Sequence, residues 1–273
     1  MAEAISSPAI SAFDSIAESF DARFAPWKSV AAQRKAVRIE LAKAFPPGSS
    51  LIEIGGGTGE DACWLLDRGR QVLLTDPSPA MVRAAAAKFE SQPGGRAKVA
   101  LAEQLELFGS SLSAERFDGA YSNFAALNCV TDLAPVARGL ARLLRPDAPA
   151  LIVIFGTFCS GEVLVEGLRG RPRNMLRRLA HKPVPAQLGE QEFTIRYHRA
   201  SALKTAMAPW FDFDGKQAIG LFVPPSTAEP WISSHPRLLR ALEGLDRRLS
   251  RPLAMFGDHI LYRFTRNGTV GPM

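Results

Sequence analysis

The stretch Leu51-Ile-Glu-Ile-Gly-Gly-Gly-Thr-Gly-Glu60 decides the fold of this chain. An apolar run ends in a glycine-rich turn, and a helical pattern begins at Glu60. Glycine allows the backbone to turn tightly and to approach a ligand closely, because it has no Cβ. The first N–H groups of the following helix are free to bind polar ligand atoms. We therefore expect a strand, a ligand-binding turn and a helix in succession.

The spacing of the glycines indicates which ligand this turn is built for. Gly55, Gly57 and Gly59 form the pattern G-x-G-x-G, and Glu53 lies two residues before the first of them. The dinucleotide fingerprint G-x-G-x-x-G requires a small residue at position 60. Glu60 is large and acidic, so the spacing argues against a dinucleotide turn.

The rest of residues 49–156 alternates between strands and helices. Apolar strands are expected at 51–55, 71–75, 98–101, 117–121 and 150–155, and helices at 60–68, 79–91 and 132–144. Strands separated by crossover helices predict a parallel sheet with helices on both faces. In such sheets ligands bind beyond the carboxyl ends of the strands, and the glycine turn falls at that edge.

The alternation ends at Gly156. Residues 157–209 form an insertion rich in basic residues and interrupted by prolines, with a strand-like segment at 192–197. A sixth strand is expected at 210–213 and 217–223, with a turn at Asp214-Gly215. A helix at 236–249 and a last strand at 259–264 follow.

Residues 11–45 have the periodicity of helix. Phe13, Ile16, Phe20, Phe24 and Trp27 recur at spacings of three and four, which places them on one helical face. A second helical stretch at 30–44 ends before Phe45-Pro-Pro-Gly48. The aromatic face either packs on the domain or covers a substrate pocket, and the pattern leaves both interpretations open.

Several motifs in order resemble class I S-adenosylmethionine-dependent methyltransferases of the small-molecule type. Glu53 with the glycine turn is similar to the first motif of that family. Asp76 in VLLTDPSPAMV, the Ala102-Glu103 step and Phe117–Phe124 are similar to the motifs that follow the second, third and fourth strands. The resemblance implies a Rossmann-like seven-stranded mixed sheet with helices on both faces. Its last strand would be antiparallel, with an N-terminal helical lid and a cap inserted after the fifth strand.

The resemblance also implies which residues bind S-adenosylmethionine. The expected set is Glu53, Gly55, Gly56, Gly57, Gly59, Asp76, Pro77, Ser78, Ala102, Glu103, Asn123 and Phe124. Glu53 and the glycines would hold the methionine part, and Asp76 would accept hydrogen bonds from the ribose hydroxyls. The chain departs from the family at Leu101, which stands where an acid often contacts the adenine. Backbone groups of Ala102, or Glu103 itself, would then replace that contact.

No side chain identifies the group that receives the methyl. Asn128 and His198 are weak candidates, chosen from their place after the fourth strand and after the insertion, and a surface or packed histidine is the alternative for His198. His259, entering the last strand, is expected to be structural. No nucleophile constellation or metal-ligand spacing is present, and no metal is expected.

The implied domain organisation has four parts. These are a helical lid (1–48), the cofactor-binding core (49–156), the basic cap insertion (157–209) and the strands that complete the sheet (210–273). The net charge of the chain is +6, and nine basic residues against four acids lie between 160 and 209.

The basic segment predicts a partner only in broad terms. Residues Arg169–Lys182 could form a basic amphipathic helix on a membrane, a cap over an acidic substrate, or a solvated arginine-rich face. Nucleic acid is not expected, because no stacking aromatics interleave the arginines and no RNA-binding motif occurs. The oligomeric state cannot be read from the sequence.

The cysteines and the N-terminus bear on the compartment. Cys63, Cys129 and Cys159 are odd in number and widely spaced, which predicts reduced thiols and a cytoplasmic protein. The N-terminus has no basic region of a secretory signal, and no apolar run approaches the length of a membrane span.

Three functions stay in competition at this point. The favoured one is methyl transfer from S-adenosylmethionine to a small-molecule or lipid-like acceptor by in-line displacement. The second is an NAD(P)-dependent oxidoreductase, disfavoured by Glu60 and by the absence of a Tyr-x-x-x-Lys pair after the fourth strand. The third is a non-catalytic protein that retains the cofactor-binding fold.

Overall fold

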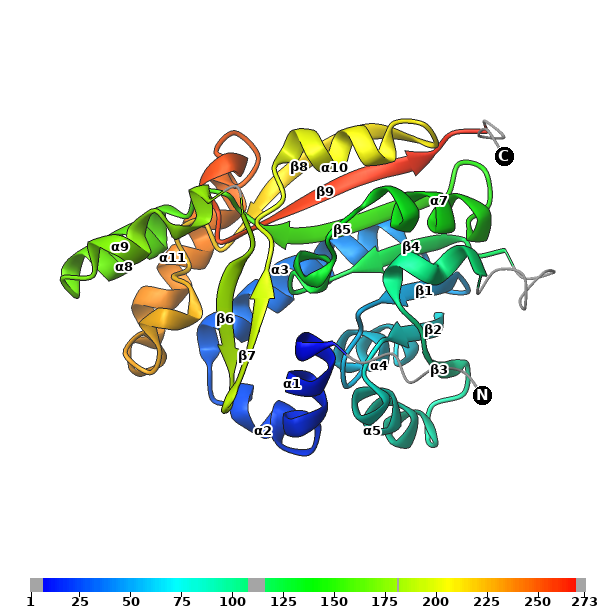
Figure 1. Ribbon diagram of the computed structural model, residues 1–273, viewed down its shortest axis with the longest axis horizontal. Coiled ribbons are helices and arrows are strands. Elements are labelled where there is room, and N and C mark those ends of the chain that lie inside the picture. Colours follow the sequence, from blue (N-terminus) through cyan, green and yellow to red (C-terminus); the bar gives the residue numbers. More distant parts are fainter. Residues whose placement is uncertain (1–6, 108–115, 181, 269–273) are drawn as a thin grey trace.

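The computed structural model describes residues 7–107, 116–180 and 182–268. Its centre is one seven-stranded sheet with the strand order β3-β2-β1-β4-β5-β9-β8 (Figure 1). The strands span Ser50–Ile54 (β1), Gln71–Asp76 (β2), Gly95–Val99 (β3), Gly119–Ser122 (β4), Pro149–Phe155 (β5), Phe211–Ile219 (β8) and His259–Arg266 (β9). The first five pair in parallel, and β9 runs antiparallel between β5 and β8. The seven-stranded mixed sheet expected from the sequence is therefore confirmed.

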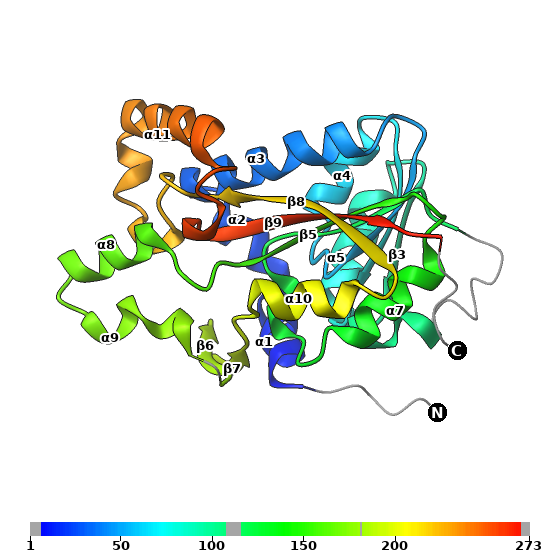
Figure 2. The same ribbon diagram turned by 90° about the horizontal axis from the view of Figure 1, so that it is seen from above.

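The helices cover both faces of the sheet. Those of the core are α3 (Lys28–Ala44), α4 (Glu60–Leu66), α5 (Pro79–Phe89), α7 (Ala134–Leu143), α10 (Ala200–Met207) and α11 (Pro236–Leu249). Figure 2 shows α3 and α4 on one side of β5 and β9, and α7 and α10 on the other. This is the two-faced arrangement that crossover helices produce on a parallel sheet.

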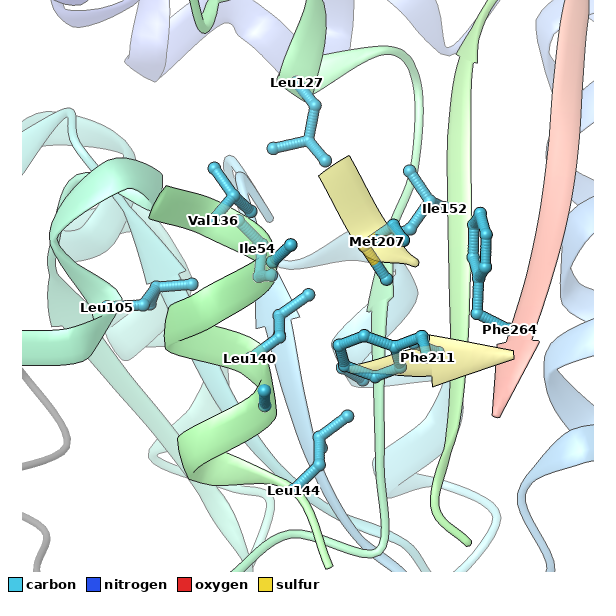
Figure 3. Close-up of a cluster of buried hydrophobic side chains, with 14 of the residues drawn as sticks. Ile54, Leu105, Leu127, Val136, Leu140, Leu144, Ile152, Met207, Phe211 and Phe264 are labelled. Carbon is cyan, nitrogen blue, oxygen red and sulfur yellow. The ribbon is translucent and has the colours of Figure 1, made fainter. Parts of the chain in front are cut away.

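Alternating strand residues separate two hydrophobic cores. Ile52 and Ile152 point into the core that α7 and α10 cover, and Leu51 and Leu151 into the core that α3, α4 and α5 cover. Because side chains along a strand point alternately to opposite faces, a strand buried on both sides is apolar at most positions, and Glu53 is a buried exception in β1. That requirement explains the unbroken apolar runs in the sequence. Figure 3 shows the first core, with Leu140 of α7 among its labelled residues.

Several element boundaries differ from the sequence prediction, including those of the third strand, the sixth strand and the N-terminal helical region. The third strand begins at Gly95, three residues before the predicted start, and ends at Val99. The sixth strand is continuous, because Asp214 is absorbed as an irregularity in its pairing with β9 between Phe213 and Gly215. The N-terminal helix is divided into α1 (Pro8–Ile16), α2 (Phe20–Phe24) and α3, joined by short turns.

The insertion after β5 contains two separate units. A helical hairpin consists of α8 (Ser160–Leu168) and α9 (Pro172–Met175), and a β-hairpin consists of β6 (Val184–Leu188) and β7 (Gln191–Ile195). Helix α10, also within the predicted cap, buries Leu203 and Met207 in the first core. We therefore propose that the cap ends before residue 200 and that α10 belongs to the core domain.

The lid and the β-hairpin touch each other. The Phe13 ring of α1 lies 5.8 Å from the Phe193 ring of β7, and the aromatic series continues through Phe20, Phe24 and Trp27. The aromatic face thus packs on itself and on the β-hairpin, and its covering of a substrate pocket stays a prediction.

Replacing Leu140 by alanine tests the core. Leu140 is fully buried, so Leu140→Ala should lower the free energy of unfolding by about 2–5 kcal/mol through lost burial and a residual cavity. Urea denaturation followed by circular dichroism measures it. Leu238→Ala, at a partly exposed leucine of α11, is the control and should cost less than about 1 kcal/mol. Equal losses in both variants would contradict the assigned core.

Candidate active site

The glycine turn between β1 and α4 has a backbone conformation that residues with a Cβ rarely adopt. Gly55, Gly57 and Gly59 have φ values of +65°, +55° and +81°, in the left-handed region that favours glycine. A Cβ on Gly55 would lie 2.3 Å from the Ala126 Cβ, so this turn also touches the segment after β4. The predicted turn is present, and it faces the carboxyl edge of the sheet.

Glu53 is buried beneath this turn. It is 2% exposed, and among the described residues no group forms a hydrogen bond with its Oε2 atom, although the buried Tyr121 hydroxyl lies close enough to act on this carboxyl group. Burial, together with the nearby Asp61 charge, raises the pKa of Glu53 well above its usual range. A buried carboxyl oxygen without a partner is costly unless a ligand donor satisfies it. The ammonium group of a methionine moiety is such a donor, so this residue fits the implied cofactor.

A network of buried charges adjoins Glu53. Asp61 accepts hydrogen bonds from Arg38 Nε at 2.6 Å and from Asn123 Nδ2 at 2.7 Å, and Arg34 Nη1 lies 3.7 Å away. Asn123 Oδ1 in turn accepts from the backbone N–H of Phe124 at 2.7 Å. Both polar atoms of the Asn123 side chain are therefore committed, and its role is to join the end of β4 to the start of α4.

The network borders a groove of about 540 Å³ between α2, α3 and α4. Arg34 and Arg38 line this groove, and their side chains keep 19% and 20% exposure. The sequence analysis missed Arg34, Arg38 and Asp61. Only their positions mark them in the sequence. Asp61 lies in the first turn of α4, and Arg34 and Arg38 are four residues apart on α3.

Asp76 ends β2 beside the glycine turn. Its Oδ2 accepts from Gly57 N–H and its Oδ1 from Ser78 N–H, both at 2.9 Å. Burial raises the pKa of Asp76 to about 6, although the two hydrogen bonds oppose the shift. A carboxylate oxygen accepts more than one hydrogen bond, so both oxygens retain capacity for ligand hydroxyls. This matches the ribose role expected from the sequence.

The segment after Asp76 is bound by helix α1 of the N-terminal lid. Ser78 caps α5 by accepting from Met81 N–H and donates its own hydroxyl proton to Asp14 of α1. Asp14 also accepts from Ala80 N–H at 3.0 Å. The lid therefore crosses the end of β2, and the Ser78 hydroxyl is engaged in capping.

Ala102 and Glu103 form a 3₁₀ turn that follows β3. The carboxylates of Asp76 and Glu103 both lie near enough to the exposed Cys129 thiol for their charges to act on it. The three residues therefore gather at one end of the sheet. The expected adenine segment adjoins the expected ribose acid.

The chain after β4 is strained. Phe124 and Ala125 have φ values of +47° and +58° without being glycine, and each such conformation costs about 1–2 kcal/mol. Strain of this kind persists where surrounding contacts fix it, often at functional sites. The Phe124 ring lies under the Arg34 guanidinium at 4.7 Å and meets the edge of the His259 ring at 5.9 Å.

His259 lies at this edge. Its ring stacks on Phe155 at 4.7 Å, and its Nδ1 lies 3.3 Å from Asp258 Oδ2. Although burial opposes it, the His259 and Arg178 charges hold the pKa of Asp258 below its usual range. The sequence analysis expected a structural histidine. It could not foresee the location, because the antiparallel β9 starts at the edge where the parallel β4 and β5 end.

Asn128 and His198, the two weak candidates for contact with the methyl acceptor, both make hydrogen bonds to backbone groups. Asn128 donates from Nδ2 to the Arg196 carbonyl and accepts from Phe155 N–H at its Oδ1. His198 Nε2 contacts the Val130 carbonyl at 2.9 Å, and burial lowers its pKa. Both side chains join loops through these contacts, so we propose a positioning role for them, and a direct role toward the acceptor stays a prediction.

Cys159, Glu162 and Asp258 lie close enough for one metal ion. However, Arg178 donates to both carboxylates, and burial raises the pKa of the Cys159 thiol to about 12. Arg178, together with Arg177 on Glu162, offsets the two carboxylate charges, and the thiol stays protonated. We interpret it as a structural ion pair.

Comparison with known proteins identifies the fold family. Residues 52–150 match a family model described as "Methyltransferase domain". The chain carries a class I S-adenosylmethionine-dependent methyltransferase domain. It is thus an S-adenosylmethionine-dependent methyltransferase, as expected from the sequence, and its cofactor is S-adenosylmethionine. This result argues against the alternative of an NAD(P)-dependent oxidoreductase.

Solved structures share the methyltransferase's fold at low identity. One from Methanosarcina mazei, described as an S-adenosylmethionine-dependent methyltransferase, is 17% identical with a TM-score of 0.56, covering 83% of this chain and 96% of that chain. The CcbJ methyltransferase from Streptomyces caelestis is 14% identical with a TM-score of 0.57, covering 87% and 90%. A third, described as "Conversion of a Disulfide Bond into a Thioacetal Group during Echinomycin Biosynthesis", is 22% identical with a TM-score of 0.50, covering 85% and 81%. None of the curated proteins matches the sequence.

Replacing Asp61 by asparagine tests the charge network of the methyltransferase. Asp61→Asn leaves Arg38 and Arg34 without a buried counter-charge. We expect the free energy of unfolding to fall by about 2–3 kcal/mol, less than for a fully buried pair because the arginines keep some exposure. Chemical denaturation measures the loss. Asp67→Asn, at an exposed acid of the same segment, is the control, and equal stability of both variants would contradict the network.

Proposed function

We propose that this methyltransferase holds S-adenosylmethionine along the carboxyl edge from β1 to β4. The buried, unpartnered Oε2 of Glu53 carries the proposal. Glu53 and the glycine turn would receive the methionine part, Asp76 the ribose, and the Ala102–Glu103 turn the adenine. Pro77 and Ser78 shape the turn beside the ribose, and Phe124 adjoins the methyl group, with Asn123 fixing its backbone.

The chain's chemical task is then mainly alignment. When bound, S-adenosylmethionine supplies the electrophilic methyl group and the leaving group of an in-line displacement. The protein orients the acceptor on the line of attack and excludes water. The strained Phe124 backbone and the His259 ring lie at the edge where acceptor and cofactor would meet.

We propose a small or lipid-like acceptor. The lid and the β6–β7 hairpin meet through Phe13 and Phe193. We infer that a site enclosed by these two elements favours a small molecule over a folded macromolecule. Phe124 and Phe155, both partly exposed, offer apolar surface near the edge. The similar structure named for echinomycin biosynthesis concerns a small molecule, which is consistent with this class. We retain a cytoplasmic location as a proposal, supported by three free cysteines.

A labelling experiment tests methyl transfer to such an acceptor. The protein is incubated with methyl-deuterated S-adenosylmethionine and with separate polar and lipid fractions of a cell extract. A new product heavier by one labelled methyl group is expected in one fraction, detected by mass spectrometry. If neither fraction is labelled while calorimetry shows cofactor binding, the non-catalytic cofactor-binding alternative is favoured.

Asp76→Ala tests the ribose assignment. It removes a carboxylate expected to accept two ligand hydrogen bonds, so S-adenosylmethionine binding should weaken by about 1–3 kcal/mol. Titration calorimetry measures the affinity, with S-adenosylhomocysteine as a second ligand. Asp212→Ala on β8, an exposed acid on the far edge strand, should bind as the unmodified protein does. Unchanged affinity in Asp76→Ala would refute the assignment.

Cofactor affinity should depend on pH through the same residue. The pKa of Asp76 is about 6 without ligand, and the ligand hydroxyls favour the carboxylate form. Below pH 6 a proton must leave Asp76 on binding, so the Asp76 contribution should raise the dissociation constant as pH falls, by up to about tenfold per unit, and this contribution should level off above about pH 7. Asp76→Asn should flatten this slope, and what remains belongs to Glu53. A constant affinity between about pH 5 and pH 8 would contradict the linkage.

A further inference from the structure

The helical hairpin of residues 160–180 projects from the sheet at the end opposite β3 (Figures 1 and 2). Its two acids lie inside it. Glu162 is 2% exposed and pairs with Arg177 and Arg178, and Glu166 is 3% exposed and accepts from Asn174 Nδ2 at 2.9 Å. These contacts pin α8 to the returning segment, and they remove both carboxylates from the surface.

The outer surface is left with leucines and basic groups. Leu164, Leu168, Leu176 and Leu179 are 63%, 82%, 56% and 51% exposed. Arg169, Arg171 and Lys182 are exposed on or beside the same hairpin. Among described residues 160–180 and 182, no exposed residue is acidic. Large aliphatic side chains are rarely left in water in such density without a partner.

The surroundings add positive charge. Helix α11 lies at the same end of the molecule in both views (Figures 1 and 2). Its arginines Arg237, Arg240, Arg247 and Arg248 are exposed, whereas its acids Glu243 and Asp246 are half-buried. This end of the protein therefore combines an apolar protrusion with a positive surface.

We propose that the hairpin is a membrane-docking element that lies in the interface of an anionic lipid bilayer. Leucine side chains gain from entering the acyl boundary, and arginine and lysine gain from anionic headgroups. A bilayer interface offers both environments at once. A nucleic acid offers only the charge, and the described hairpin has no exposed aromatic ring for base stacking.

The docking is peripheral. Helix α8 has nine residues, about 14 Å of helix, against roughly 30 Å of bilayer hydrocarbon. No helix in the described ranges is long and apolar enough to cross a membrane. The hairpin therefore rests in the headgroup region.

The base of the hairpin adjoins the reaction edge. Arg178 donates to the Asp258 carbonyl at 2.7 Å and lies over the Phe155 and Tyr197 rings at 5.3 and 5.6 Å. Docking would thus bring the candidate active site to the lipid surface, where an amphipathic acceptor is concentrated. That consequence rests on the proposed function, whereas docking itself does not, so the two fail separately.

Vesicle co-sedimentation without cofactor tests docking. The full chain should sediment with vesicles that contain phosphatidylglycerol and phosphatidylcholine. It should bind phosphatidylcholine alone at least about tenfold more weakly, and added salt should weaken binding to the anionic vesicles. Failure to bind anionic vesicles at low ionic strength would overturn the proposal.

Two variants separate the apolar and charged contributions. Leu164→Ser with Leu168→Ser should reduce vesicle binding about tenfold or more, and Arg171→Glu with Lys182→Glu should remove the preference for phosphatidylglycerol. Val99→Ser on β3 and Arg83→Glu on α5 are matched exposed controls and should bind normally. Unfolding curves establish that each variant is folded.

Two further outcomes would overturn the proposal. One is equal loss of binding in the matched controls, which would indicate non-specific adsorption. The other is a concentration-dependent dimer in sedimentation velocity that the leucine variant abolishes, together with no vesicle binding. That result would assign the hairpin to a contact between copies of this chain.

Discussion

The turn after β1 is the constraint on which the site depends. Three left-handed glycines carry the chain from a fully buried strand into α4 and let the segment after β4 come within contact of the turn. A side chain at Gly55 would collide with Ala126, so the two loops approach only because position 55 lacks a Cβ. The same turn covers the buried Glu53, and its Gly57 N–H donates to Asp76.

Charge burial is the second determinant. Glu53, Asp61 and Asp76 lie close together at this edge, where water has little access. The groups that offset the repulsion among these three carboxylates are distributed unequally. Asp61 has two arginines, Asp76 has two backbone N–H groups, and Glu53 Oε2 has no partner in the described chain. A buried carboxyl group without a hydrogen-bond partner is destabilising. The unpartnered oxygen of Glu53 therefore indicates where a cationic ligand group would bind.

The insertion shows how tertiary contacts change the meaning of a charge pattern. In sequence, Arg177 and Arg178 look like members of one basic face. In the structure Arg178 is buried, bridging Glu162 and Asp258, and Arg177 pairs with the same glutamate. The basic surface is therefore smaller than the sequence indicated, while the exposed leucines make it more apolar. A continuous amphipathic helix does not form, because the chain turns back at Gly170 and Pro172.

The sequence by itself determined the sheet, the glycine turn and Asp76, because strand periodicity and local backbone requirements are written in neighbouring residues. It also located α11 at its observed bounds. Only the tertiary structure decided the roles of Arg34, Arg38, Asp61 and His259. The two arginines meet Asp61 because α3 packs beside α4, and His259 reaches this edge because β9 inserts beside β5. For the same reason Asn128 and His198, plausible by position, proved to be engaged by distant backbone groups. Local sequence patterns predict where the methyl donor binds, and long-range packing decided which side chains surround that edge.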